Sequence, residues 1–331
     1  MKAYAVFEGG GVKGLALVGA LWAAESRGYT WQNVAGTSAG AIVAALVAAG
    51  YTAEEIKKLM FELDLPRLKD AMGIGCIPLV GKAVSLFWKK GLYKGEYFTT
   101  WLRSKLAAKG VTTFRDLKYS RGHHEHSDYK LQIIAADISR GKMLVLPEDI
   151  ADYGLAPDDL EVAIAVRMSM SIPLYYEPVK WNFVDGKGRQ TVSYIVDGGI
   201  LSNYPLWLFD TQEEPEYPTF GFRLGQPPGS VRTTTPHTIS GPISLMTAMV
   251  STMMDAHDRK HIEEVDFART IYIPTWGVGV TDFHLSELKK TELFQSGKKA
   301  ANNFFKDWDF PAYLSSYRVM VQARKEKERL A

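Results

Sequence analysis

The chain has 331 residues, of which 46% are hydrophobic and 23% are charged, and its formal net charge is +2 at pH 7. This composition is typical of a globular protein, and α/β enzymes of this length often form one unit. The small net charge, without a basic stripe that interleaves aromatic residues, excludes the usual signature of nucleic-acid binding. No apolar run reaches the roughly 18 residues that a membrane span needs.

The N-terminus and the cysteine count indicate the compartment. The first residues, MKAYAVFEGG, lead directly into an expected strand and leave no room for a signal peptide. The single cysteine, Cys76, rules out an internal disulfide bond and fits a reducing environment. We therefore expect a cytoplasmic protein, with peripheral residence at a membrane as the alternative. The oligomeric state is left open.

Hydrophobic periodicity predicts alternating strands and helices along the chain. A strand at 3–8 leads through a glycine turn into a helix, and a short strand at 33–35 leads into a helix at 39–49 that Gly50 ends. The later predicted elements are helices at 53–63 and 94–109, strands at 130–138 and 142–147, a helix at 158–169, strands at 178–184, 191–196, 218–224 and 269–275, a helix between the last two strands, and helices at 286–306 and 311–329.

This alternation predicts an α/β fold, specifically a three-layer sandwich with a mainly parallel central sheet and helices on both faces. No linker divides the chain cleanly. We expect one domain over residues 1–310, with residues 311–331 as a C-terminal helical extension of the same unit.

A serine stands between two glycines at the second strand-to-helix turn, in the pentapeptide GTSAG at 36–40. A side chain at Gly36 or Gly40 would crowd this turn and block the approach to the serine oxygen. At the start of the following helix, the hydroxyl of Ser38 would lie among unpaired backbone N–H groups and the positive end of the helix dipole. Because both stabilise a developing alkoxide, the pattern makes Ser38 a candidate nucleophile.

The first glycine turn, GGGVKG at 9–14, presents several bare N–H groups to an anion. Two anions fit: a dinucleotide pyrophosphate, since the turn matches G-x-G-x-x-G, or the oxyanion of a tetrahedral intermediate. Dinucleotide binding also requires an acidic residue about 20 residues on, at the end of the second strand. The chain has none there. We therefore favour the oxyanion and keep a nucleotide-binding oxidoreductase as an alternative.

A third motif, Asp197-Gly198-Gly199, follows the expected strand TVSYIV at 191–196. The two glycines let the chain turn sharply and leave the carboxylate at the C-terminal end of the strand. Open α/β sheets place their chemistry at that edge. Asp197 is thus a candidate catalytic residue, and a capping aspartate in an ordinary turn is the structural alternative.

Together, these three motifs resemble the bacterial patatin-like phospholipases in their order and spacing. Three further stretches agree: AVRMSMSIPLYYEPV at 165–179, DGGILSNYP at 197–205 and TDFHLS at 281–286. The resemblance extends from about residue 3 to about residue 305. It implies a patatin-like α/β fold, hydrolysis of lipid or ester substrates, a Ser–Asp dyad without histidine, and no cofactor.

In such a dyad, Ser38 attacks an ester carbonyl, and water then releases the acid from the acyl-enzyme. Asp197 accepts the serine proton, although a carboxyl with the ordinary pKa of about 3.9 is a weak base. Desolvation in an apolar cleft would raise that pKa. The oxyanion hole is assigned to the backbone N–H groups of Gly9, Gly10, Gly11 and Val12, each well-aimed donor contributing on the order of 3 kcal/mol. The motif residues in support are Lys13, Gly14, Gly36, Gly40, Gly198 and Gly199.

Lys13 has two interpretations: it adds positive charge near the loop, or it is solvated in the first turn of the helix.

The nucleophile also has an alternative partner. His257 and His284 both follow Asp197, in the chain order of a Ser–Asp–His esterase of the α/β-hydrolases. Those enzymes carry several strands before the nucleophile, whereas only one or two precede Ser38. A catalytically silent lipid-binding module is the third possibility.

A histidine-rich stretch raises the question of a metal site. It contains His123, His124, Glu125, His126 and Asp128. This spacing is too tight for one tetrahedral site, and the segment is strongly polar, so we expect a solvated loop and no metal.

Two segments are candidates for substrate selection. Residues 71–93 are apolar, glycine-punctuated and end near Trp88 and two lysines. They form either a lid-like flap that makes transient contact with a membrane surface or a segment packed on the body of the protein. The methionine-rich residues 245–254 either line an acyl-chain pocket or belong to the core. The head group, the acyl position, the chain length and the physiological role are left open.

Overall fold

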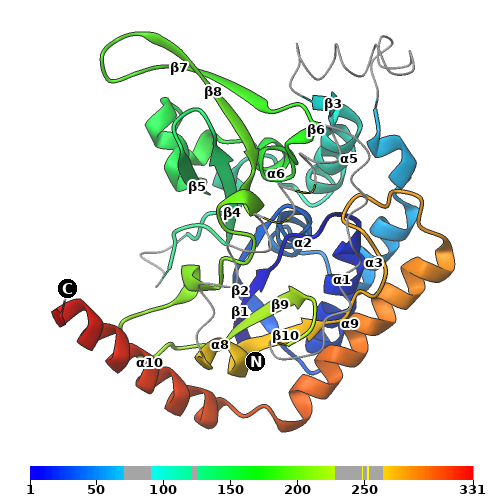
Figure 1. Cartoon of the computed structure of the whole chain (residues 1–331), viewed down its shortest axis with the longest axis vertical. Helices are drawn as coiled ribbons and strands as arrows, with labels where there is room; N and C mark the ends of the chain where they lie inside the picture. The colour runs from blue at the N-terminus through cyan, green and yellow to red at the C-terminus, as the bar shows by residue number, and fades with distance from the viewer. Residues whose placement is uncertain (71–90, 121–125, 228–247, 249–251, 253–263, 331) are drawn as a thin grey trace.

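Eight strands of the described chain form one mixed sheet in the order β10-β9-β1-β2-β4-β8-β7, with β5 as a further partner of β4 (Figure 1). The computed structural model describes residues 1–70, 91–120, 126–227, 248, 252 and 264–330. The parallel strands are β1 (Lys2–Phe7), β2 (Thr30–Thr37), β4 (Leu131–Asp137), β9 (Thr219–Leu224) and β10 (Thr270–Ile273). The α/β fold predicted from the sequence is therefore confirmed.

The sheet departs from the parallel pattern at one side. The strands β5 (Lys142–Leu146) and β8 (Gln190–Asp197) both pair antiparallel with β4, and β7 (Val179–Val184) pairs antiparallel with β8. Because β5 follows β4, and β8 follows β7, after only a few residues, each pair closes as a hairpin without a crossover helix. The β7–β8 hairpin projects beyond the rest of the sheet (Figure 1).

The predicted helices that fall in the described residues are also present. They are α1 (Gly14–Glu25), α2 (Ala39–Ala48), α3 (Ala53–Glu62), α5 (Glu96–Ala107), α6 (Val162–Ser169), α9 (Glu287–Asp307) and α10 (Phe310–Leu330). The helix expected between the last two strands, at 244–264, lies mostly outside the described residues, and α8 (Glu264–Arg269) begins at its last expected residue. The short parallel pair of β3 (Gly91–Tyr93) and β6 (Leu174–Tyr176) was not predicted, since three residues are too few for a periodic signal.

Both faces of the sheet are buried, as the alternation along β1 shows. Ala3, Ala5 and Phe7 belong to the large core that includes α1 and α2. Tyr4 and Val6 point the other way and pack with Tyr204, Leu206 and Phe209 from the segment after β8. Because successive side chains of a strand point to opposite faces, a strand buried on both sides is apolar throughout, as AYAVF is.

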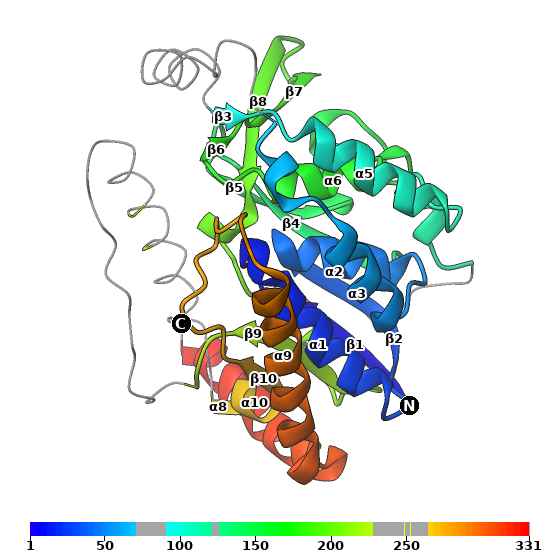
Figure 2. The ribbon, with the colours of Figure 1, turned by 90° about the vertical axis from the view of Figure 1, so that its right-hand side faces the viewer.

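Helices α1 and α9 lie side by side against the sheet (Figure 2). A Cβ atom at Gly19 of α1 would overlap the Phe294 carbonyl, and one at Gly297 of α9 would overlap the Ala16 carbonyl. The two glycines thus let the helix backbones approach closely. Since α9 packs on the first helix of the chain, residues 287–307 belong to the same folded unit, while a division at residue 310 remains a prediction.

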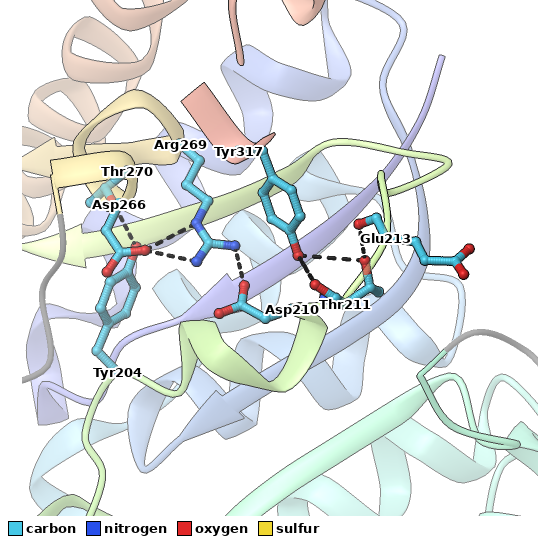
Figure 3. Close-up of polar contacts among 8 residues, drawn as sticks. All are labelled: Tyr204, Asp210, Thr211, Glu213, Asp266, Arg269, Thr270 and Tyr317. Carbon is cyan, nitrogen blue, oxygen red and sulfur yellow. Dashed lines mark hydrogen bonds and ion pairs between the residues drawn. The ribbon is translucent and has the colours of Figure 1, made fainter. Parts of the chain in front are cut away.

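A buried ion-pair network joins the C-terminal elements to the segment after β8 (Figure 3). Arg269, at the end of α8, forms ion pairs with Asp210 at 2.5 Å and with Asp266 at 2.7 Å. The hydroxyl of Tyr317 in α10 accepts a hydrogen bond from the Thr211 amide at 2.6 Å. Because a buried charge that loses its partner is strongly destabilising, the ion pairs hold α8 to the segment after β8, and the Tyr317 hydrogen bond joins α10 to the same segment.

Replacement of Gly297 by Val should destabilise the protein, because the added side chain must separate α9 from α1. We expect the free energy of unfolding to fall by about 1–3 kcal/mol or more. Urea titration followed by circular dichroism measures it. Asn303→Val places the same valine side chain at an exposed position of the same helix. This control should change the free energy of unfolding by only about 0.5 kcal/mol. Equal effects of the two substitutions would contradict the proposed packing.

Candidate active site

Ser38 lies at the junction of β2 and α2, in a backbone conformation that non-glycine residues rarely adopt. Its φ is 53° and its ψ is −121°, and the residue is 3% exposed. A Cβ atom at Gly36 would overlap the Gly40 carbonyl, and one at Gly40 would overlap the Phe7 carbonyl. The tight turn therefore accepts no side chain at either flanking position, and it presents the serine at the start of α2.

Strand register brings Asp197 to the same level of the sheet. Thr37 pairs with Ile134 of β4, and the next residue of β4, Ala135, pairs with Asp197. Ser38 and Asp197 thus end their strands on opposite sides of β4. From the sequence we expected Asp197 at this edge because open α/β sheets carry their chemistry at the C-terminal ends of parallel strands. That reason is wrong, since β8 is antiparallel to β4. It reaches the edge because it pairs only with the last residues of β4.

The carboxyl group of Asp197 is completely buried. Its Oδ1 atom accepts a hydrogen bond from the Gly199 amide at 2.8 Å, and the Ser38 hydroxyl also interacts with the carboxyl. Its Oδ2 atom forms no hydrogen bond of normal geometry with any described residue. A Cβ atom at Gly198 would overlap the Ile134 carbonyl, so the turn after Asp197 can pass β4 only with glycine there.

Burial raises the pKa of Asp197 to about 7, an effect that the hydrogen bonds from Ser38 and Gly199 only partly offset. The cause is desolvation, since a carboxylate without water around it is less stable than the neutral acid. A carboxyl with a pKa near the working pH is a far better proton acceptor than one with an ordinary pKa.

Two of the four amides predicted for the oxyanion hole already have partners. The Gly9 amide donates to the Asn203 carbonyl at 3.0 Å, and the Val12 amide donates to the Val280 carbonyl at 3.1 Å. Within the part of the chain that the structure describes, no acceptor engages the amides of Gly10 and Gly11. These two are the donors that this conformation offers to an anion.

A small apolar cavity adjoins Ser38, with a volume of about 60 Å³. Its walls come from six separate segments and include Val12, Ile42, Met60, Phe98, Met170 and Phe283. These residues were not predicted as cavity walls from the sequence. The apolar face of α3, the helix that carries Met60, is one signal that could have indicated burial there. A ligand that is apolar along its length suits this cavity better than a polar ligand.

The other predicted residues of the motifs surround this centre or lie apart from it. Lys13 is half-buried at the end of the short 3₁₀ helix Gly11–Lys13, and Gly14 begins α1 close to Met60. His284 is exposed and lines a different surface pocket, together with Lys290. His257 lies outside the described residues, as do Cys76 and Trp88.

Parts of the segments considered for substrate and metal binding also lie outside the described residues. These are 71–90, most of 245–254, and His123, His124 and Glu125. His126, expected in a solvated loop, instead packs edge-on against Tyr4 with 4.6 Å between the rings. Burial lowers the pKa of His126 to about 4. Across the described part of the chain, no three His, Cys, Asp or Glu residues are grouped closely enough to hold a metal ion.

Comparisons with known proteins show the family of this chain. Residues 5–210 match the family model of the patatin-like phospholipases. The uncharacterized protein YqhO of Bacillus subtilis (strain 168) is 42% identical over 306 residues, which are 92% of this chain and 98% of that protein. A probable lipid hydrolase, 463L of Invertebrate iridescent virus 6, is 27% identical over 203 residues, or 61% of each chain.

The fold also has a counterpart among solved structures. The crystal structure of VipD from Legionella pneumophila superposes with a TM-score of 0.51 at 18% sequence identity, and the match covers 92% of this chain and 67% of that one. At this identity the likeness concerns the fold alone. Among the helices in the described residues, none has both the length and the apolar character that crossing a membrane requires.

Replacement of Asp197 by Asn should stabilise the protein, and more so at pH 8 than at pH 5. The pKa of this carboxyl is higher in the folded protein than the usual 3.9 of an unfolded chain. Its contribution to stability is therefore present at low pH and is lost as the pH rises through about 7, by about 4 kcal/mol in total, of which about 2.5 kcal/mol falls between pH 5 and pH 8. Melting temperatures of both proteins at the two pH values measure the effect, and an equal difference at both would contradict the raised pKa.

Proposed function

Because the chain belongs to the patatin-like phospholipase family, we propose that it is a serine acyl hydrolase in which Ser38 and Asp197 form a catalytic dyad. The substrates are acyl esters of lipids, in the manner of a phospholipase A, a lysophospholipase or a carboxylesterase. One observation carries the proposal: a serine in a strained strand-to-helix turn interacts with a fully buried carboxyl group beside an apolar cavity.

In the first step, the Ser38 oxygen attacks the ester carbonyl while its proton passes to Asp197. Because the pKa of Asp197 is raised to about 7, the carboxylate can accept this proton near neutral pH. The amides of Gly10 and Gly11 stabilise the oxyanion of the tetrahedral intermediate. Collapse of that intermediate transfers the proton to the leaving alcohol and leaves the acyl group on Ser38.

In the second step, Asp197 takes a proton from a water molecule that attacks the acyl-enzyme. The acid leaves, the proton returns to the Ser38 oxygen, and the dyad is restored. The start of α2 assists both steps, since the positive end of its dipole lies at Ser38. The roles of Gly9 and Val12 are then structural in this conformation, because their amides hold the loop to Asn203 and Val280.

The apolar cavity supports a lipid substrate. Its walls offer an acyl chain a dry environment, and burial of each methylene contributes about 0.8 kcal/mol. The relative named as a probable lipid hydrolase is consistent with this assignment. Contact of residues 71–93 with a membrane surface remains a prediction, since only 91–93 of them are described.

Ser38→Ala should abolish both ester hydrolysis and covalent labelling by a fluorophosphonate probe, because it removes the attacking oxygen. Mass spectrometry of the labelled protein should locate the phosphonate on Ser38. His257→Ala and His284→Ala are the controls for a Ser–Asp–His triad, and both should keep wild-type turnover within about threefold. A loss of several orders of magnitude in either histidine variant would overturn the dyad.

The pH dependence of hydrolysis tests the role of Asp197. The base must be ionised in the free enzyme, so kcat/KM should rise with pH, reach half of its plateau near pH 7 and stay level above it. Rates with a p-nitrophenyl ester, corrected for the ionisation of p-nitrophenol, measure this profile. A plateau that extends down to pH 5 would show that the group acting as base has an ordinary carboxyl pKa.

A further inference from the structure

The C-terminal end of α6 lies between the two residues of the dyad. Ser169, the last residue of this helix, is completely buried. Its Oγ atom accepts a hydrogen bond from the backbone amide of Ser38 at 2.9 Å and donates one to the Ile134 carbonyl at 2.6 Å. This stretch, RMSMSIP, belongs to the sequence resemblance to the patatin-like phospholipases, but no role for its serines was predicted from it.

The same turn contacts the backbone of the base. The Asp197 amide donates a hydrogen bond to the Ser171 carbonyl at 3.0 Å. The Ser171 hydroxyl donates to the Arg167 carbonyl at 2.6 Å, one turn earlier in the chain. A single tripeptide, residues 169–171, therefore binds the main chain of Ser38 through a side chain and the main chain of Asp197 through a carbonyl.

A buried arginine holds this tripeptide in place. The guanidinium group of Arg167 donates hydrogen bonds to the Ser171 hydroxyl, to the Lys94 carbonyl and, at 2.9 Å, to the Glu177 carbonyl. These acceptors lie on three different segments, which fixes the side chain from several directions. A residue whose own conformation is locked in this way can position the groups that it contacts.

The orientation of the Ser169 hydroxyl follows from its two hydrogen bonds. A serine hydroxyl has one proton and two acceptor lone pairs. The Ile134 carbonyl can only accept, so the proton of Ser169 points to Ile134, and a lone pair is left for the Ser38 amide. That amide belongs to a residue with a strained backbone, and a strained conformation persists only where its surroundings determine it.

We propose that Ser169 is a positioning residue of the active site, which holds the Ser38 backbone in the conformation that directs its oxygen at the substrate. This inference rests on the proposed function and deepens it. Ser169 touches neither the substrate cavity nor the reacting atoms, so it acts through Ser38. Without its oxygen, the Ser38 amide would be a buried donor without an acceptor, and the turn would relax toward an ordinary conformation.

The test compares the wild type with Ser169→Ala in ester hydrolysis and in fluorophosphonate labelling. We expect kcat to fall by about 10²-fold, the usual effect of displacing a catalytic group by about 1 Å. KM should change by less than about threefold, because Ser169 is not part of the cavity wall. The labelling rate should fall with kcat, while the melting temperature shows that the variant is folded.

Ser193→Ala is the matched control. Ser193 lies in β8, is also completely buried, and its hydroxyl has no hydrogen-bond partner among the described residues. This substitution removes the same atom from an equally buried position and should leave kcat within about threefold. A loss of kcat in Ser193→Ala equal to that in Ser169→Ala would overturn the proposal, as would a Ser169→Ala variant with wild-type kcat.

Ser169→Cys keeps the test decisive if the alanine variant does not fold. The thiol has a similar volume but is a weak donor and acceptor. A folded cysteine variant with kcat lowered at least tenfold supports the positioning role, and wild-type kcat overturns it. Failure of the proposed function would appear differently: the wild type itself would then neither be labelled at Ser38 nor hydrolyse esters.

Discussion

The exclusion of water from the carboxyl group of Asp197 is the constraint on which the proposed chemistry of this protein depends. A carboxylate in water is too weak a base to assist a hydroxyl, whereas the buried carboxyl has a pKa of about 7. This burial requires the surrounding chain to close completely around the group. The carboxyl group therefore lies in the core, between β4 and the turn at Gly198, and not in an exposed loop.

Register across β4 accounts for the meeting of residues that are far apart in the chain. β2 reaches this strand from one side and β8 from the other, and both end opposite its middle, at Ile134 and Ala135. The turn at residues 169–171 then ties the two strand ends together from one face of the sheet. Position is thus set by backbone pairing and by buried hydrogen bonds, which are more rigid than contacts between long side chains.

The segment that follows β10 also contributes to the site, although it lies beyond the part matched by the family model. The Val280 carbonyl engages the glycine loop, and Phe283 forms part of the cavity wall next to Met60 and Phe98. The packing of α9 on α1 holds this segment in position. The segment after β10 is therefore a structural partner of the glycine loop, and α9 supports it.

The order of the elements, the two glycine turns and the candidates Ser38 and Asp197 could be predicted from the amino-acid sequence, because each is a local property of spacing, periodicity or turn chemistry. The antiparallel direction of β8, the bonded state of two loop amides and the contact of Ser169 with the Ser38 backbone became visible only in the folded chain. These features depend on contacts between segments that are far apart in the chain, such as Ala135 and Asp197 at a separation of 62 residues and Ser38 and Ser169 at a separation of 131. No periodic pattern in a single sequence reports which distant segments will meet, since that choice is made by the packing of the whole core.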